Sequence, residues 1–207
     1  MNPVINALKF RHACKQFDPA KRVGSQDLDV ILDAACLSPS SFGMEAWKFL
    51  VLASKDIRKK LRPACWDQAQ VTDASHVIVI LARPSLVEPD NDYVLENFKR
   101  RGLPEDAVLA YVDRYKKYQE TEVDPRMSTY AWCAKQCYIS LANIMTCAAS
   151  LGIDTCPMEG FEKERVEEIL EIDTRQFQVA VLVALGYRAG DQSLRRRLDR
   201  KRLVEIR

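Results

Sequence analysis

Two short runs of this chain, residues 76–82 and 177–185, are almost entirely apolar and rich in Val and Ile. They are too short and too β-branched for helices, so both are predicted to be buried strands. Another short, mainly apolar run at 47–53 predicts a third strand. Together with the helices predicted around them, these strands indicate an α/β or α+β sandwich.

The spacing of apolar residues predicts the helices. Asn2 and Pro3 are an N-cap and a first helical residue, which begins a helix that runs to about Lys9. Ser25 is predicted to cap a second helix, which Ser38 and Pro39 end. Further helices are predicted over residues 56–61, 127–151 and 162–170.

The 207 residues suit a single domain, 1–207, with two unusual parts. Residues 84–126 carry many charges and aromatic residues and are predicted to form a helical excursion, two helices joined by Gly102-Leu103-Pro104. The C-terminal tail, 188–207, has eight Lys or Arg against three Asp or Glu and no core pattern of its own. We expect this tail to reach a partner subunit.

Charge and cysteine content narrow the class of protein. A net charge of +2 gives no overall field that attracts nucleic acid or membranes, and no apolar run approaches the ~20 residues that span a bilayer. Seven cysteines, an odd number without a CxxC pair, suit reduced thiols in a cytoplasmic protein. Cys133 and Cys137 share a helix face without a nearby histidine, so core packing is favoured over metal binding.

Arg11, His12 and Lys15 form the densest group of candidate site residues. In an extended segment Arg11 and Lys15 face one side and His12 the other, whereas a bent segment could wrap all three around one anion. Charge-assisted hydrogen bonds from fixed donors suit phosphate. An exposed basic turn is the alternative interpretation.

Three other segments could carry chemistry. The loop from Ser38 to Trp47 offers hydroxyls, a glycine and backbone N–H groups to a polar heterocycle edge, although an ordinary turn has the same composition. Residues 157–161 are predicted to lead into a helix, whose free N–H groups would suit an acceptor. The basic residues at 195–202 could bind nucleic acid or phosphate. They lack nucleic-acid-binding motifs, which disfavours nucleic acid, and a solvated face is the commoner explanation. The chain has neither GxGxxG nor GxxxxGK[ST].

The ordered set of motifs resembles the FMN-dependent nitroreductase family, the oxygen-insensitive NAD(P)H nitroreductases. Arg11-His12-Ala13-Cys14-Lys15-Gln16-Phe17-Asp18 is similar to its Arg-His-Ser-x-Lys-x-Phe-Asp. Leu37-Ser38-Pro39-Ser40-Ser41 through Trp47 is similar to its Ser-Pro-Ser-Ser-x-Asn-x-Gln-Pro-Trp. Asp73-Ala74-Ser75-His76, Trp132-x-Ala134-Lys135-Gln136, Gly152-Ile153-Asp154, Pro157-Met158-Glu159-Gly160-Phe161 and Arg200-Lys201-Arg202-Leu203 continue the match.

The resemblance implies an α+β sandwich with a central mixed sheet flanked by helices, in an intertwined homodimer with FMN at two interface sites. It places Arg11, His12, Arg200 and Arg202 around the phosphate and Lys15 near the N1/O2 edge. Ser40, Ser41 and Gly43 would come from the partner, and the backbone at Glu159 and Gly160 would face N5 and O4. The full expected cofactor-binding set is Arg11, His12, Ala13, Lys15, Pro39, Ser40, Ser41, Gly43, Asp67, Gln70, Pro157, Met158, Glu159, Gly160, Arg200 and Arg202, with Lys15, Glu159 and Gly160 as catalytic.

Several positions depart from the family pattern. Ala13 replaces a serine, Gly43 an asparagine and Glu45-Ala46 a Gln-Pro pair; Asp67 and Gln70 align where some members have Asn and Lys. The expected activity is ping-pong hydride transfer through flavin N5, from NADH or NADPH to a nitroaromatic or quinone. Enone or dihydropteridine reduction and a non-catalytic FMN-binding sensor or store are the alternatives.

Overall fold

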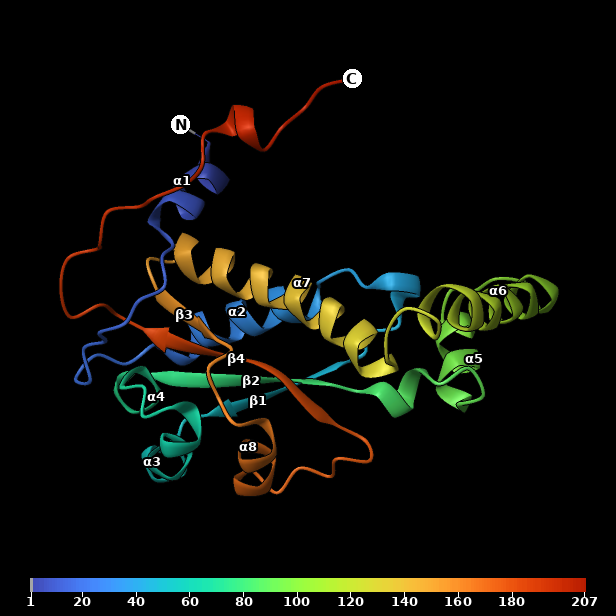
Figure 1. Cartoon of the computed structure of the whole chain (residues 1–207), viewed down its shortest axis with the longest axis horizontal. Helices are drawn as coiled ribbons and strands as arrows, with labels where there is room; N and C mark the ends of the chain where they lie inside the picture. The colour runs from blue at the N-terminus through green and yellow to red at the C-terminus, as the bar shows by residue number, and fades with distance from the viewer. Residues whose placement is uncertain (1) are drawn as a thin grey trace.

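The computed structural model describes residues 2–207, which form a four-stranded sheet between two layers of helices (Figure 1). The strands are β1 (Trp47–Leu52), β2 (His76–Ala82), β3 (Asp154–Met158) and β4 (Gln178–Gly186). The α-helices are α1 (Pro3–Phe10), α2 (Ser25–Cys36), α3 (Lys55–Leu61), α4 (Gln70–Asp73), α5 (Asp92–Lys99), α6 (Glu105–Tyr118), α7 (Thr129–Ser150) and α8 (Lys163–Ile169). The α+β class is confirmed.

The sheet has the order β1-β2-β4-β3 and every pairing in it is antiparallel. The prediction of a mixed sheet was therefore wrong for these strands. Within the described residues, 2–207, a parallel pairing occurs at the isolated bridge between Ala13 and Thr155. The three predicted strands are confirmed within one residue. The fourth, β3, was missed, because its five residues Asp-Thr-Cys-Pro-Met lack a periodic apolar pattern.

The central strand β2 is buried at every residue because it has helices on both sides. Ile78 and Ile80 pack into the core that faces α2 and α7, whereas Val77, Val79 and Leu81 pack into the core on the α3 and α8 side. Neighbouring strand residues point to opposite faces, so a strand covered on both sides needs apolar residues throughout. Each such side chain contributes roughly 1.5–3 kcal/mol relative to exposure.

Local signals explain most helix boundaries. The Asn2 side chain accepts hydrogen bonds from the backbone of Val4 and Ile5, and Pro3 is the first residue of α1. Ser25 is the first residue of α2 and Gly24 is its cap, so the prediction of Ser25 as the cap was wrong by one residue. The two excursion helices, α5 and α6, are confirmed and project from one end of the molecule (Figure 1).

The N-terminal segment after α1 crosses the end of the sheet at Gly186. The Phe17 ring would lie 2.9 Å from a Cβ added at Gly186, so only glycine lets the segment pass this closely. Phe17 and Arg188 form an antiparallel bridge, and the amide of Asp18 donates to the carbonyl of Tyr187 at 2.8 Å. These contacts hold residues 11–17 beside β3 and the start of the tail.

The tail leaves β4 and runs along α1 (Figure 1). Beyond Arg188 it forms one short 3-10 turn, Arg200–Arg202, and its apolar residues are exposed: Leu194, Leu198, Leu203, Val204 and Ile206. Across residues 2–207, no helix combines the length and apolarity that crossing a membrane requires.

Candidate active site

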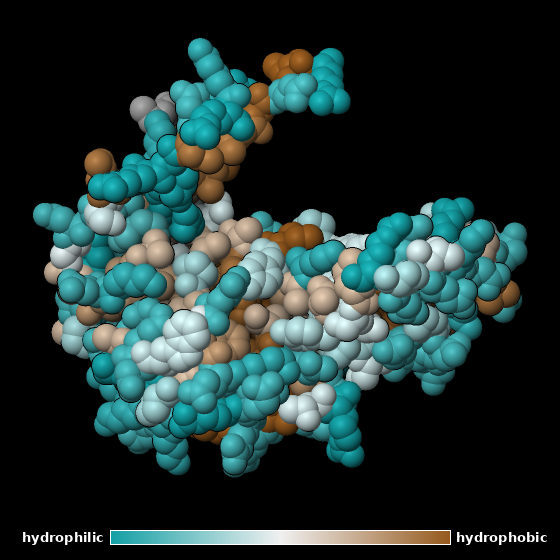
Figure 2. All heavy atoms as spheres, viewed as in Figure 1, coloured by the Kyte–Doolittle hydropathy of each residue, from teal (hydrophilic) through white to brown (hydrophobic). Residues whose placement is uncertain are grey.

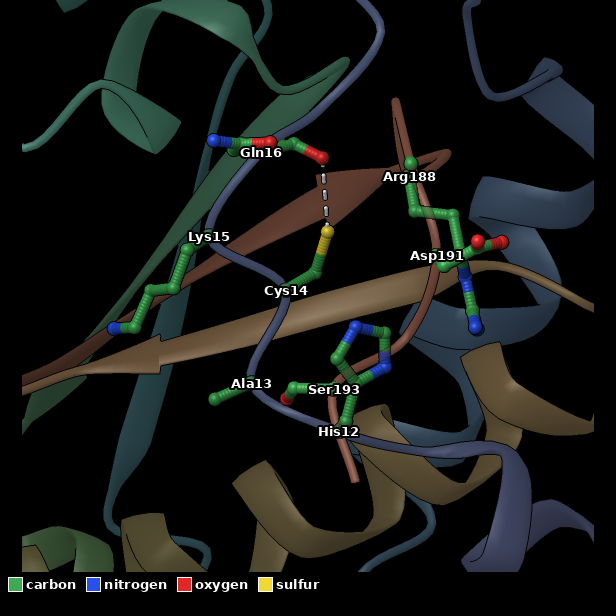
Figure 3. Close-up of a pocket in the computed structure, with 9 residues that line it drawn as sticks. His12, Ala13, Cys14, Lys15, Gln16, Arg188, Asp191 and Ser193 are labelled. Carbon is green, nitrogen blue, oxygen red and sulfur yellow. Dashed lines mark hydrogen bonds between the residues drawn. The ribbon is translucent and has the colours of Figure 1, made fainter. Parts of the chain in front are cut away.

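A cavity of about 210 Å³ opens where the N-terminal segment meets the tail (Figure 3). It is lined by His12, Ala13, Cys14, Lys15, Gln16, Arg188, Gly190, Asp191 and Ser193. A groove of about 480 Å³ shares His12, Ala13 and Ser193 with this cavity and adds Arg11 and Arg195–197. We call the two together the cationic groove.

Lys15 and His12 point to different sides of the segment (Figure 3). Lys15 Nζ lies 3.5 Å from the buried Sγ of Cys156, and Gln70 Nε2 lies 3.9 Å from the same sulfur. His12 Nδ1 lies 3.6 Å from Asp154 Oδ1. The predicted alternation within an extended segment is thus confirmed for this pair, because β3 holds the segment in line through the bridge at Ala13.

Gln68 links this group to Gly160. Its amide donates 2.8 Å to the Gly160 carbonyl and accepts from Gln70 Nε2 at 2.8 Å. A Cβ at Gly160 would stand 2.7 Å from the Trp66 ring, so glycine is required for this close approach. Three predicted site residues are therefore connected by these contacts: Lys15 and Gln70 through their side chains and Gly160 through its backbone carbonyl.

Asp154 anchors the wall of the cavity. Its Oδ2 accepts hydrogen bonds from the Arg188 backbone N–H at 2.9 Å and from Arg188 Nε at 3.0 Å, and its Oδ1 lies 2.5 Å from Arg188 Nη2. The Arg188 guanidinium also lies over the Phe10 ring, 4.4 Å from its centroid. Burial and the Arg188 charge lower the pKa of His12, although Asp154 opposes the shift. His12 is therefore favoured in its neutral form.

The outer end of the groove is crowded with guanidinium groups. Arg195 Nη2 donates to the carbonyl of Lys9 at 3.1 Å and to the carbonyl of Arg11. Burial, followed by the charges of Arg195 and Arg197, lowers the pKa of Arg11. Cations held this close repel one another, and a bound anion would relieve the repulsion. This end of the groove suits a phosphate.

The serine loop, residues 38–45, lies elsewhere in the same chain. The amide of Ser41 donates to Gln136 Oε1 at 2.9 Å, and Asn143 Nδ2 donates to Ser38 Oγ at 2.8 Å. Glu159, in contrast, accepts a hydrogen bond from the hydroxyl of Tyr138. Residues two apart on a helix differ by roughly 200° in direction. Pro39, Ser40, Ser41 and Gly43 are therefore separated from Glu159 and Gly160 by the body of α7.

The remaining predicted residues are only partly brought together. Asp67 is exposed, and its carbonyl accepts from Arg62 Nε at 3.1 Å. Pro157 and Met158 end β3, and the helix predicted to follow residues 157–161 is confirmed within one residue as α8, which begins at Lys163. Arg200 and Arg202 lie in the exposed turn of the tail and line neither part of the cationic groove.

Comparison with known proteins identifies the family of this chain. A model described as the nitroreductase family matches residues 8–187. The chain belongs to the nitroreductase family. The matched residues include the whole sheet and all eight helices except the first residues of α1. This match confirms the resemblance found in the motifs.

Individual proteins agree with the family assignment. A Staphylococcus epidermidis protein, assigned by name alone as an NAD(P)H nitroreductase, is 43% identical over 198 residues, 91% of this chain and 89% of its own. A nitroreductase-like protein of Streptococcus mutans has a TM-score of 0.86 at 18% identity and covers 98% of this chain and 97% of its own. A protein of Exiguobacterium sibiricum, assigned by name as a nitroreductase and solved in complex with FMN, has a TM-score of 0.82 at 21% identity over 100% and 98% of the two chains.

Several residues of this candidate site were not singled out in the sequence. Asp154 appeared only as part of a motif, and nothing in the sequence pairs it with Arg188, 34 positions away. Cys156 and Gln68 carried no signal, because a single thiol or amide has no diagnostic spacing. Arg195 and Arg197 were noted only within a basic cluster that could bind phosphate, and a solvated face was the commoner explanation for that cluster.

Proposed function

We propose that this chain is an FMN-dependent oxidoreductase that takes electrons from NADH or NADPH and reduces a small acceptor, a nitroaromatic or a quinone. The observation that carries the proposal is the cationic groove. Its inner end is lined by the segment that carries Lys15, whose ammonium lies beside Cys156, and its outer end by clustered guanidinium groups. FMN has its groups in the same order, with an isoalloxazine ring at one end and a phosphate at the other.

The residues of the chain suit FMN at both ends. Arg11 with Arg195 and Arg197 would hold the phosphate, and the main chain at His12 and Ala13 would run alongside the ribityl chain. Lys15 and Gln70 would face the pyrimidine edge, with Asp67 at its rim. Donors that are already positioned do not have to reorganise on binding, so affinity is gained at little entropic cost.

FMN, when bound, supplies hydride acceptance at N5 and passes electrons on to the acceptor. Lys15 would stabilise the negative charge that appears near N1 on reduction, since its ammonium is held beside the buried thiol of Cys156 at 3.5 Å. The backbone at Glu159 and Gly160 would face the reacting edge. Close approach is possible there because Gly160 has no Cβ and lies against Trp66.

A second copy of the chain would complete the site. The serine loop is on the other side of α7 from Gly160, so Ser40, Ser41 and Gly43 would reach an FMN bound by the partner rather than by their own chain. Figure 2 shows a hollow between α1 with the tail and the α5–α6 lobe, and α1 carries an apolar patch there. Val4, Ile5 and Leu8 on α1 are exposed, as are five apolar residues of the tail. Obligate interfaces are large and apolar, so these surfaces suit a homodimer in which the tail brings Arg200 and Arg202 to a site.

Steady-state oxidation of NADH and NADPH by the purified, FMN-loaded protein tests the activity. Nitroaromatic, quinone, enone and pterin acceptors should be compared with each donor. Turnover with a nitroaromatic or a quinone supports the proposal. Turnover with an enone or a pterin alone favours another reductase activity. Absence of turnover with every combination of donor and acceptor favours an FMN-binding sensor or store. Light scattering at low micromolar concentration should give twice the chain mass, and a stable monomer that retains FMN would contradict the two-chain site.

A further inference from the structure

Arg101 lies directly over the serine loop. Its Nη2 donates to the carbonyl of Phe42 at 2.7 Å and stands 3.6 Å from the position that a Cβ on Gly43 would take. Gly43 has a φ of +61°, which favours glycine. The guanidinium thus stands above the position where the related motif carries an asparagine side chain, and it supplies donors where Gly43 has none.

Aromatic rings fix this guanidinium in place. Arg101 Cζ lies 4.7 Å from the Phe98 ring centroid and 5.1 Å from that of Tyr111. Arg114 Cζ lies 5.4 Å from the Tyr111 centroid. Stacking on aromatic faces favours Arg over Lys and reduces the conformational freedom lost when a ligand is bound.

The loop itself is attached to α5, the helix that ends two residues before Arg101. Asn97 Nδ2 donates to the Gly43 carbonyl at 3.0 Å, and the Tyr93 hydroxyl donates to the Met44 carbonyl at 2.9 Å. The loop has left-handed backbone at Phe42, Gly43 and Glu45, a conformation that these contacts stabilise. Arg101 and the serine loop therefore form one unit.

The two neighbouring arginines differ in their partners. Arg100 Nη2 lies 3.3 Å from Glu45 Oε2, so its charge is neutralised locally. Within residues 2–207, neither Arg101 nor Arg114 has a carboxylate within ion-pair distance. Arg101 is exposed and its side chain makes a single hydrogen bond, which leaves most of the guanidinium N–H donors available.

We propose that Arg101 is a specificity-determining residue that binds an anionic group on the substrate. This proposal rests on the proposed function, in which the serine loop faces the partner's flavin and Arg101 stands at the mouth of that site. A carboxylate on the electron acceptor and the 2′-phosphate that NADPH carries and NADH lacks share the required chemistry. A guanidinium recognises either one through two parallel hydrogen bonds.

Arg101→Gln in the FMN-loaded protein separates these sources. KM should rise roughly tenfold for 4-nitrobenzoate but not for nitrobenzene if the carboxylate is the ligand, and for NADPH but not NADH if the phosphate is. Arg101→Lys should recover part of the loss, because the positive charge remains. Recovery should be incomplete, because lysine lacks the paired N–H donors of a guanidinium. Arg126→Gln, which changes an exposed arginine of the same excursion that pairs with Glu122, should leave every KM unchanged.

A binding measurement keeps the proposal independent of turnover. Calorimetric titration compares benzoate with benzamide, which lacks the carboxylate, and NADPH with NADH, which lacks the 2′-phosphate. In Arg101→Gln, binding should weaken for the compound that carries the recognised group and stay unchanged for its matched control. Equal affinities in wild type and variant for all four compounds, or equal losses for both members of each pair, would overturn the role of Arg101. Wild-type protein that binds FMN but turns over no acceptor would instead contradict the proposed function.

Discussion

Lys15 Nζ lies 3.5 Å from Cys156 Sγ, and these two residues are 141 positions apart in the chain. The thiol is fully buried, and burial raises its pKa although Lys15 opposes the shift. Lys15 is thus paired with a largely neutral group, and its positive charge is not cancelled by a carboxylate at this contact. A charge kept available in this way can respond to charge that appears on a ligand.

Replacing Lys15 with Met should make the two-electron potential of the bound flavin more negative. The variant keeps the apolar stem and loses the ammonium, so oxidised FMN should remain bound. We expect a change on the order of 1–3 kcal/mol, because a site open to substrate is partly solvated. At about 30 mV for each 1.4 kcal/mol, spectroelectrochemistry resolves this shift. Loss of FMN with an unchanged potential would move Lys15 to the phosphate end instead.

Replacing Asp154 with Asn should destabilise the protein. Asp154 is buried and holds both the backbone and the guanidinium of Arg188, so its loss leaves a partly buried cation without its counter-charge. Breaking a buried pair costs about 3–5 kcal/mol, and the partial exposure of Arg188 places the expected loss near the lower limit. Urea unfolding measures it. Asp56→Asn, at an exposed pair with Lys59, is the matched control and should leave the midpoint almost unchanged.

Stability should fall as the pH is lowered from neutral, and His76 should account for part of the loss. Burial and the charges of Arg22 and Arg58 lower the pKa of His76, so the folded state binds its proton less readily than the unfolded chain. The stabilisation is present above the ordinary histidine pKa of about 6.5 and is lost as the pH falls through the lower folded pKa. Urea unfolding at a series of pH values should give a shallower dependence for His76→Gln. An unchanged slope in that variant would show that His76 does not titrate differently on folding.

Replacing Arg202 with Ala should weaken FMN by ~1.5–3 kcal/mol, the range for a hydrogen bond to a charged group. Riboflavin, which lacks the phosphate, should be affected far less. Arg195→Ala is the informative comparison, because Arg195 already lies beside Arg11 within one chain, whereas Arg202 would reach a site only through the assembled dimer. Flavin fluorescence titration distinguishes the two ligands. Equal losses for FMN and riboflavin in Arg202→Ala would show that the residue acts through folding.

The sequence predicts elements better than it predicts contacts between them. β2 and β4 could be located because a doubly covered strand has apolar residues throughout, and α7 because its stripe persists over 22 residues. β3 could not, since its role depends on pairing with β4 rather than on its own composition. In the site, Lys15 and Gly160 were found through motifs, whereas the Asp154–Arg188 pair depends on how the tail leaves β4.

The mass of the released chromophore tests the central claim most directly. The protein should be reconstituted with a mixture of FMN, FAD and riboflavin, purified and then denatured. Mass spectrometry should identify the released flavin, and its amount should be compared with the amount of protein chain. The clustered guanidinium groups at the outer end of the cationic groove predict FMN, one per chain. FAD or riboflavin as the main species, or protein without flavin after full reconstitution, would contradict the assignment.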